Sequence, residues 1–137
     1  MAVINNWDLK DANNSVYEVR GDRLERRYMV SDLGATFGTT GLTWTLRGNL
    51  KAYSRSKWIK NISPEFINFN VPSWPAFNRW IGRHIPSADA RWIGHLLAQL
   101  SQDQIRDAFR AAGYSSQEIE GFSRAVEERI GELERLQ

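Results

Sequence analysis

The segment 87–137 constrains the fold most, because it contains two capping boxes. In each box a serine is followed three residues later by a glutamine or a glutamate: Ser101 precedes Gln104, and Ser115 precedes Glu118. The serine side chain of such a pair accepts a hydrogen bond from the backbone of the third residue. The side chain of that residue bonds back to the serine backbone, so a helix begins there. Two helices are therefore predicted to start at these serines.

Apolar residues recur at helical spacing through the same segment, and they predict three amphipathic helices. The first helix is predicted to begin at Ser87. The second is predicted to end before Gly113, because glycine is common just after a helix C-terminus. Charged residues such as Arg129 are expected on the exposed face of the third helix. Short connections between the three predict a helical bundle. The predicted buried stripes are Trp92, Ile93, Leu96, Leu97 and Leu100, then Ile105, Ala108, Phe109 and Ala112, then Ile119, Phe122, Ala125, Val126, Ile130 and Leu133.

Residues 1–86 have the pattern of strands and loops. Two short runs alternate between apolar and polar residues around the turn residues Gly21 and Asp22, which predicts a β-hairpin. A second strand pair is predicted around Ser63 and Pro64. The predicted strands are Ser15–Arg20, Arg27–Ser31, Lys57–Ile62 and Glu65–Val71.

The chain is thus predicted to be an α+β protein with one domain, residues 1–137. Its length of 137 residues is below the roughly 150 residues at which a second domain becomes the common expectation. We distinguish a hairpin with flanking loops (1–38), a basic loop and strand region (39–86) and the helical bundle (87–137). The absence of cysteine excludes disulfide scaffolds, thiol catalysis and zinc sites built on cysteine.

Charge is distributed unevenly around a formal net value of +2. Residues 1–86 contain 12 Lys or Arg and 7 Asp or Glu, a net of +5, whereas residues 87–137 contain 6 and 9, a net of −3. No acidic residue lies between Asp32 and Glu65. A basic run of this kind suits phosphate, nucleic acid or an acidic partner, and it is equally compatible with a solvated surface. The cations of the run are Arg47, Lys51, Arg55, Lys57 and Lys60.

The aromatic content is high for a chain whose hydrophobic fraction is 42%. Six Trp, six Phe and four Tyr form either a dense core or a surface that another molecule covers. The rings Trp44, Tyr53 and Trp58 alternate with the basic run. The stretch 44–60 therefore supports one candidate function, a non-catalytic module that binds nucleic acid or an acidic partner.

Candidate chemistry is concentrated in the two loops that flank the first predicted hairpin. A hairpin brings the loop before its first strand beside the loop after its second strand, so Asp8, Asn13 and Asp32 are expected to converge. Two carboxylates and an amide oxygen suit Mg²⁺, which accepts few protein oxygens and leaves room for phosphate and water. Gly34 and Gly38 are expected to let the chain turn sharply after Asp32.

These two loops resemble motifs of the protein-kinase fold. Asp8-Leu9-Lys10-x-x-Asn13 is similar to the catalytic loop, and Asp32-Leu33-Gly34 is similar to the metal loop. The longer run 30–38 more closely resembles atypical bacterial kinases of the CotH-like and HipA-like groups. The whole chain also resembles uncharacterised bacterial proteins with the same Asn-Asn-Trp-Asp-Leu-Lys start.

The resemblance implies part of a kinase C-terminal lobe that uses Mg²⁺ and ATP. Asp8 would be the catalytic base that orients the acceptor hydroxyl, and Lys10 would lie beside the transferred phosphoryl group. Asn13 and Asp32 would bind the metal, with Gly34 in the cofactor-binding loop.

The chain also departs from the kinase pattern. Asn6 and Trp7 stand where conventional kinases have His-Arg, and there is neither an Ala-Pro-Glu motif nor a G-x-G-x-x-G loop. The motif begins at Asp8, so we expect a truncated phosphotransferase that is inactive alone and would be completed by a missing nucleotide-binding lobe.

Exposed rings are expected to follow from such a truncation. Trp7, with Trp44 and Trp58, would have packed on missing elements, and several tryptophans are expected to be exposed or buried in self-association or a protein contact. Nucleic acid ranks behind these partners, because a net charge of +2 is small.

A cytoplasmic location is expected. The first residues contain no basic and apolar signal-peptide pattern, and no run of 18 or more apolar residues suits a membrane helix.

Overall fold

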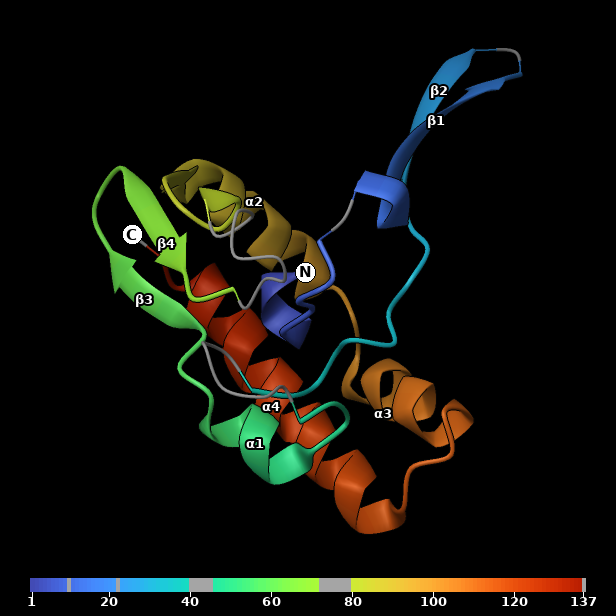
Figure 1. Ribbon diagram of the computed structural model, residues 1–137, viewed down its shortest axis with the longest axis vertical. Coiled ribbons are helices and arrows are strands. Elements are labelled where there is room, and N and C mark those ends of the chain that lie inside the picture. The colour runs from blue at the N-terminus through green and yellow to red at the C-terminus, as the bar shows by residue number, and fades with distance from the viewer. Residues whose placement is uncertain (10, 22, 40–45, 72–79, 137) are drawn as a thin grey trace.

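The computed structural model describes residues 1–9, 11–21, 23–39, 46–71 and 80–136, with only the backbone described at positions 11 and 14. Within these ranges the chain forms four α-helices and two small antiparallel sheets, which confirms the α+β class (Figure 1).

The long helix α4 lies at the centre of the structure. The helices α1, α2 and α3 and the short 3₁₀ turn η1 all contact it. Both predicted capping boxes are present, at Ser101 and at Ser115, and Gly113 follows α3 with a φ of +82°. The helices are α1 (Leu50–Arg55), α2 (Ser87–Leu97), α3 (Gln102–Ala111) and α4 (Ser116–Glu134), and the 3₁₀ turns are η1 (Ala2–Ile4) and η2 (Asp11–Asn13).

Helix α1 was not predicted from the sequence. Its six residues are too few for an apolar period to appear. Asn49 provides the start, because its side chain accepts a hydrogen bond of 2.9 Å from the backbone N–H of Ala52.

Both predicted strand pairs are confirmed. In the first sheet Asn14 lies opposite Val30 and Arg20 lies opposite Leu24. The second sheet has the order β3-β4-β5, and its third strand was not predicted because it has only two residues. The strands are β1 (Asn14–Arg20), β2 (Leu24–Val30), β3 (Ile59–Ile62), β4 (Phe66–Phe69) and β5 (Ile85–Pro86).

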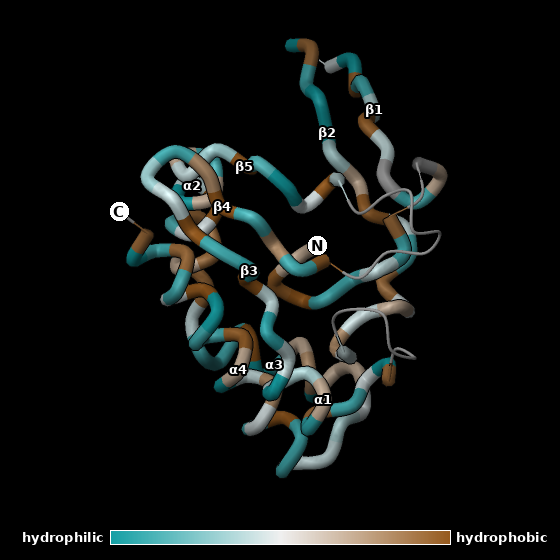
Figure 2. Tube along the Cα trace, turned by 60° about the vertical axis from the view of Figure 1, so that its left-hand side comes forward, coloured by the Kyte–Doolittle hydropathy of each residue, from teal (hydrophilic) through white to brown (hydrophobic). Residues whose placement is uncertain are grey.

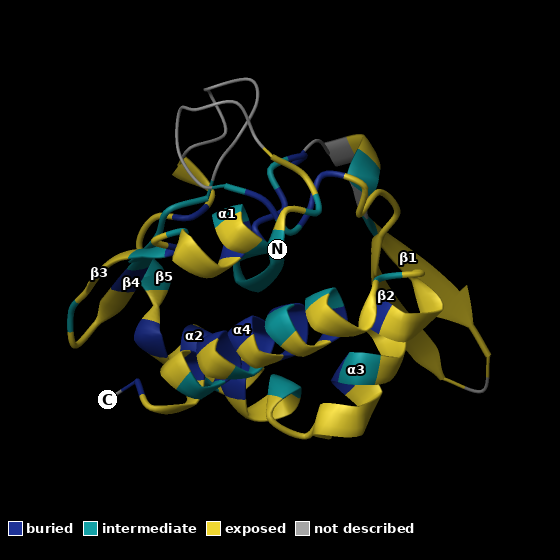
Figure 3. Ribbon diagram, turned by 90° about the horizontal axis from the view of Figure 1, so that it is seen from below, coloured by how far each residue is buried: buried dark blue, intermediate teal, exposed yellow. Residues whose placement is uncertain are grey.

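Two apolar clusters form the core, and α4 contributes to both. Every apolar residue predicted for the buried stripe of α4 is buried, as the dark face of this helix shows in Figure 3. The first cluster joins α4 to α1 and α3, and the second joins its C-terminal end to β4 and α2. The clusters are Tyr53, Ile105, Phe109, Ile119, Phe122, Ala125, Val126 and Ile130, and then Trp58, Ile67, Ala90, Leu133 and Leu136.

The predicted buried stripe of α2 is wrong. This helix buries its small residues Ser87, Ala90 and Gly94; Ala90 and Gly94 pack near α4, and the Ser87 hydroxyl donates to the Ser63 carbonyl oxygen. A Cβ atom at Gly94 would lie 2.8 Å from the Cβ of Leu133, so the two helices approach too closely there for a larger side chain. Of the predicted residues only Leu97 is partly buried, while Trp92, Ile93, Leu96 and Leu100 are 64%, 38%, 42% and 45% exposed.

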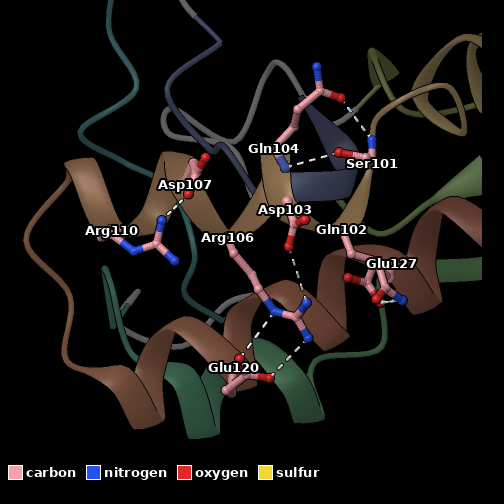
Figure 4. Close-up of polar contacts among 9 residues, drawn as sticks. All are labelled: Ser101, Gln102, Asp103, Gln104, Arg106, Asp107, Arg110, Glu120 and Glu127. Carbon is pink, nitrogen blue, oxygen red and sulfur yellow. Dashed lines mark hydrogen bonds and ion pairs between the residues drawn. The ribbon is translucent and has the colours of Figure 1, made fainter.

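In α3 the prediction is half correct. Ile105 and Phe109 are buried, whereas Ala108 and Ala112 face solvent. Polar side chains on the surface of this helix form hydrogen bonds and ion pairs, some of them with α4. One is the ion pair between Arg106 and Glu120 at 3.1 Å (Figure 4). Exposed ion pairs of this kind contribute roughly 0–1 kcal/mol each, so the apolar contacts hold α3 in place.

The hairpin β1–β2 projects away from the rest of the molecule (Figures 1 and 2). All seven residues of β2 are exposed. Among the described residues no helix is both long and apolar enough to span a membrane.

Candidate functional site

The structure brings together the two loops that flank the hairpin, residues 5–13 and 31–38. The backbone N–H of Ser31 donates to the carbonyl oxygen of Asn13 at 3.0 Å. The side-chain amide of Asn6 donates to the backbone oxygen of Asp32 at 3.2 Å. The chain segments that contain Asp8, Asn13 and Asp32 are therefore neighbours, while Lys10 lies outside the described residues.

Asn6 links the predicted catalytic and metal residues. It is fully buried, and its side-chain oxygen accepts a hydrogen bond of 2.9 Å from the backbone N–H of Asp8. Since its nitrogen binds Asp32, a single amide spans both loops. Asp8 itself is 7% exposed, whereas Asp32 is exposed.

A local turn holds the Asp32 carboxylate. Its Oδ1 accepts a hydrogen bond of 2.9 Å from the backbone N–H of Gly34, the pattern of an Asx turn. A Cβ atom at position 34 would lie 3.2 Å from this same oxygen. Gly34 therefore lets the carboxylate approach the backbone without pressing on a side chain.

The chain turns at Gly34 and bends at Gly38 as predicted, but a left-handed backbone is not the reason for either glycine. Among the described residues the positive φ in this loop belongs to Phe37, at +55°, and to neither Gly34 nor Gly38. Gly38 is required by close packing, because a Cβ atom there would overlap the carbonyl oxygen of Leu46. The backbone of a neighbouring segment, and not a tight turn, selects glycine at this position.

Phe37 anchors the second loop in the helical core. Its ring makes edge-to-face contacts with Tyr53, Phe109 and Phe122 at centroid distances of 5.2, 5.1 and 5.5 Å. Its backbone N–H donates to the carbonyl oxygen of Ile4 at 2.8 Å. The residue that extends the metal-loop motif thus fixes the loop to helices α1, α3 and α4.

Asn5 fixes the first loop in a similar way. It is 1% exposed and has a φ of +52°, a left-handed conformation that asparagine tolerates better than most residues. Its side-chain nitrogen donates to the Gly38 carbonyl and to the Ser56 hydroxyl, both at 2.7 Å. The sequence pattern did not identify this residue as structurally important.

Arg129 of α4 completes this support, and its predicted exposure is wrong, because only 4% of the residue is exposed. One guanidinium nitrogen donates to the Val3 carbonyl at 2.7 Å and to Asn5 Oδ1 at 2.8 Å. The other donates to the Tyr53 carbonyl at 2.9 Å and to the Ser56 hydroxyl at 2.7 Å. The residue therefore joins α4 to the N-terminal turn and to α1.

The charge of Arg129 is compensated by hydrogen bonds and an aromatic ring. The guanidinium carbon lies 3.9 Å from the centre of the Tyr53 ring, a cation–π contact. Burial lowers the pKa of Arg129, and Tyr53 and Glu132 oppose that change. Burial also raises the pKa of Tyr53 to about 12, with Arg129 opposing it, and the Tyr53 hydroxyl donates to Val3 at 2.6 Å.

The aromatic residues of the basic stretch lie mostly in the core. Tyr53 is fully buried, and Trp58 is 5% exposed, stacks on Phe69 and donates to Glu132 at 2.8 Å. The expectation that Trp58 would be uncovered is therefore wrong, and neither ring is available for stacking on a base. Trp44 lies outside the described residues, as does Trp74.

Among the other described tryptophans, Trp80 is 69% exposed and Trp7 is half-buried, in agreement with the expected exposure of several rings. Trp92 is 64% exposed, although it was predicted to be buried. The cations of the basic run are also exposed: Arg47, Lys51, Arg55, Lys57 and Lys60.

Among the described residues no group of three or more His, Cys, Asp or Glu side chains could hold a metal ion. The candidate set contains two carboxylates and one amide, Asp8, Asp32 and Asn13, so it is not a group of that type. Comparison with protein-family models, curated proteins and solved structures gives no match.

Proposed function

We propose that loops 5–13 and 31–38 form a Mg²⁺-dependent phosphate-binding site of a kinase-like C-terminal lobe. The observation that supports this most is the Asn6 amide, which bonds to Asp8 on one side and to Asp32 on the other. A fully buried side chain with this double role keeps the two acidic loops in a fixed relation.

The donor types fit the ion. Mg²⁺ prefers carboxylate and carbonyl oxygens and retains sites for phosphate and water. In the proposed site Asp32 and Asn13 would hold the metal, which would neutralise phosphate charge when bound. Asp8 would accept the proton of an acceptor hydroxyl, and Lys10 would lie beside the transferred phosphoryl group.

We expect this stretch of chain to bind the phosphates of a nucleotide but to catalyse little or no phosphoryl transfer by itself. The 137 residues contain no G-x-G-x-x-G loop to cover a nucleotide. Phosphoryl transfer depends almost entirely on positioning and charge stabilisation. A site with only the metal-binding half of that arrangement would lose nearly all of the rate.

A thermal-shift titration tests this site. Mg²⁺–ATP is expected to raise the unfolding midpoint of the wild-type chain, and Asp32→Ala is expected to abolish the increase. Asp103→Ala is the matched control, because that carboxylate is 91% exposed on α3. No shift in the wild type, or an equal shift in Asp32→Ala, would contradict the proposal.

The second candidate function is a non-catalytic surface for an acidic partner. It is favoured by the exposed basic residues of α1 and β3, of which Lys51 and Arg55 lie on one short helix. Fluorescence anisotropy with a labelled polyglutamate peptide and a single-stranded oligonucleotide, at low and high salt, distinguishes the partners. Lys51→Glu with Arg55→Glu should abolish binding, and no binding at low salt would reject this candidate.

A further inference from the structure

The hairpin β1–β2 contains the basic pair Arg26-Arg27, the one place in the 137 residues where two Lys or Arg residues are adjacent. Both lie in β2, every residue of which is exposed, and their side chains are 67% and 56% exposed. Their ion pairs, with Glu18 at 3.4 Å and with Glu25 at 3.0 Å, join exposed groups and contribute little to stability. The basic pair is therefore accessible to another protein.

The backbone around this pair already has the conformation that an endopeptidase binds. A peptide bound as an added strand is held by its main chain, and its alternate side chains enter separate pockets. In β2 the backbone is extended, and consecutive side chains of a strand point to opposite faces. Arg26 and Arg27 can thus enter different pockets of one enzyme, and an acidic group in such a pocket selects arginine.

The hairpin can open without unfolding the rest of the molecule. Its strands pack mainly on each other and on η2, and in the described part of the chain no third strand pairs with either. It projects away from the helices (Figure 1). An isolated two-stranded sheet is marginally stable in water, and proteolysis proceeds through locally opened states of this kind. Cleavage therefore requires opening of the hairpin and leaves both apolar clusters folded.

The segment that precedes the hairpin is attached to the rest of the chain independently of it. The Val3 carbonyl accepts hydrogen bonds from Arg129 and from the Tyr53 hydroxyl. Asn5 donates to the Gly38 carbonyl, and the turn η1 contacts α4. All of these partners follow the hairpin in the sequence, so a break within the hairpin leaves each of these contacts in place.

We propose that hairpin β1–β2 is a cleavage site for an endopeptidase that recognises paired basic residues, and that the two products stay together as one folded molecule. Water adds to the carbonyl carbon of Arg27, and the C–N bond between Arg27 and Tyr28 breaks. The Arg27 carbonyl keeps the hydroxyl and becomes a carboxyl group, while the Tyr28 nitrogen takes the proton and becomes an amine. The products are residues 1–27 and 28–137. This inference does not depend on the proposed metal site.

Digestion with a dibasic-specific endopeptidase, followed by mass spectrometry, tests the position of the site. The wild type should give 1–27 and 28–137, and Arg26→Gln with Arg27→Gln should leave the chain intact. Asp107→Arg, added to that double variant, puts a basic pair at 106–107 in the packed helix α3. Cleavage there should be at least about tenfold slower than in the wild-type hairpin, because α3 is held by the first apolar cluster and opens less often.

Size-exclusion chromatography with light scattering of the cleaved wild type tests whether the products stay together. One peak with the 15.8 kDa mass of the whole chain is expected in buffer, and two peaks are expected in concentrated urea. Circular dichroism of the cleaved molecule should show the helix content of the intact chain. A synthetic peptide of residues 20–31 is the control for enzyme activity, because it contains the same pair without the folded protein.

Three results would overturn the inference. A wild type that stays intact while the peptide is cleaved shows that the folded hairpin is not a substrate. Equal cleavage rates in the hairpin and in α3 show that the basic pair alone, and not the exposed hairpin, selects the site. Separate elution of the two products in buffer shows that the N-terminal segment depends on the intact hairpin for its attachment.

Discussion

Arg129 is the residue on which the N-terminal turn, α1 and α4 depend together. Its guanidinium group donates four hydrogen bonds, to two backbone carbonyls and two side-chain oxygens, and all four acceptors are far from Arg129 in the sequence. Through Asn5, which also bonds to Gly38, this network reaches the loop that contains Asp32. A buried charge is expensive unless its hydrogen bonds are complete, so single substitutions in the network should have large effects.

Arg129→Met is expected to destabilise the chain by about 3–5 kcal/mol, because it leaves several buried acceptors without a donor. Arg129→Lys should be only partly better, since an ammonium group cannot reproduce the planar fork of a guanidinium. Urea unfolding of both variants measures the effect. Arg124→Met is the control on the exposed side of α4, and a similar loss there would contradict the role of the network.

Tyr53 should make the stability sensitive to alkaline pH. Its pKa is raised from 10.0 to about 12 by burial, so the unfolded chain loses the phenolic proton first as the pH increases. The stabilisation is complete below pH 10 and declines between pH 10 and about 12, by about 3 kcal/mol at most. Urea midpoints across this range should fall less steeply for Tyr53→Phe than for the wild type.

At the scale of elements, α2 is the helix whose packing departs most from its sequence pattern. Its contact with α4 includes Gly94, where an added Cβ atom would overlap Leu133 and the backbone of Glu134. Because the side of α2 with small residues packs on α4, the large apolar residues of α2 remain exposed.

Gly94→Ala tests this close approach. Alanine normally stabilises a helix by about 1 kcal/mol relative to glycine. At position 94 its Cβ would lie 2.8 Å from Leu133 Cβ and 3.0 Å from the Glu134 nitrogen, so a net loss of about 1–2 kcal/mol is expected.

Gly131→Ala is the matched control for the Gly94 substitution. Its added Cβ meets mainly the flexible end of Arg135, which can move aside, so unchanged or increased stability is expected. Thermal denaturation of both variants decides the matter. Equal effects at the two positions would show that close packing at Gly94 is unimportant.

At the scale of the whole molecule, α4 connects the two apolar clusters of the core. Phe122 belongs to the cluster with α1 and α3, and Leu133 belongs to the cluster with α2 and the second sheet. Because one helix contributes to both, we expect the two clusters to unfold together. The projecting hairpin contributes to neither cluster.

Phe122→Ala and Leu133→Ala should therefore lower one shared unfolding transition. Each is expected to cost about 2–5 kcal/mol, because each removes a fully buried side chain. Tryptophan fluorescence and far-ultraviolet circular dichroism should report the same midpoint in each variant. Two separated transitions in either variant would show that the clusters unfold independently.

Local features of the sequence determined much of the fold. The capping boxes at Ser101 and Ser115 and the apolar spacing of 119–133 were sufficient for α3 and α4, because a helix start and a single-sided stripe are local properties. The first hairpin was predicted in the same way, from the alternation of its strands and the turn residues between them. The candidate site was predicted to the extent that the hairpin brings its two flanking loops together.

Only the tertiary structure decided which polar groups are buried and which apolar groups are not. Arg129 has the spacing of an exposed residue, yet it is buried because Val3, Asn5 and Tyr53, far away in sequence, supply its hydrogen-bond acceptors. The large residues of α2 have the spacing of a core stripe, yet they are exposed because α4 approaches the small side of the helix. Local spacing defines the faces of an element, whereas the packing of distant segments selects the face that is buried.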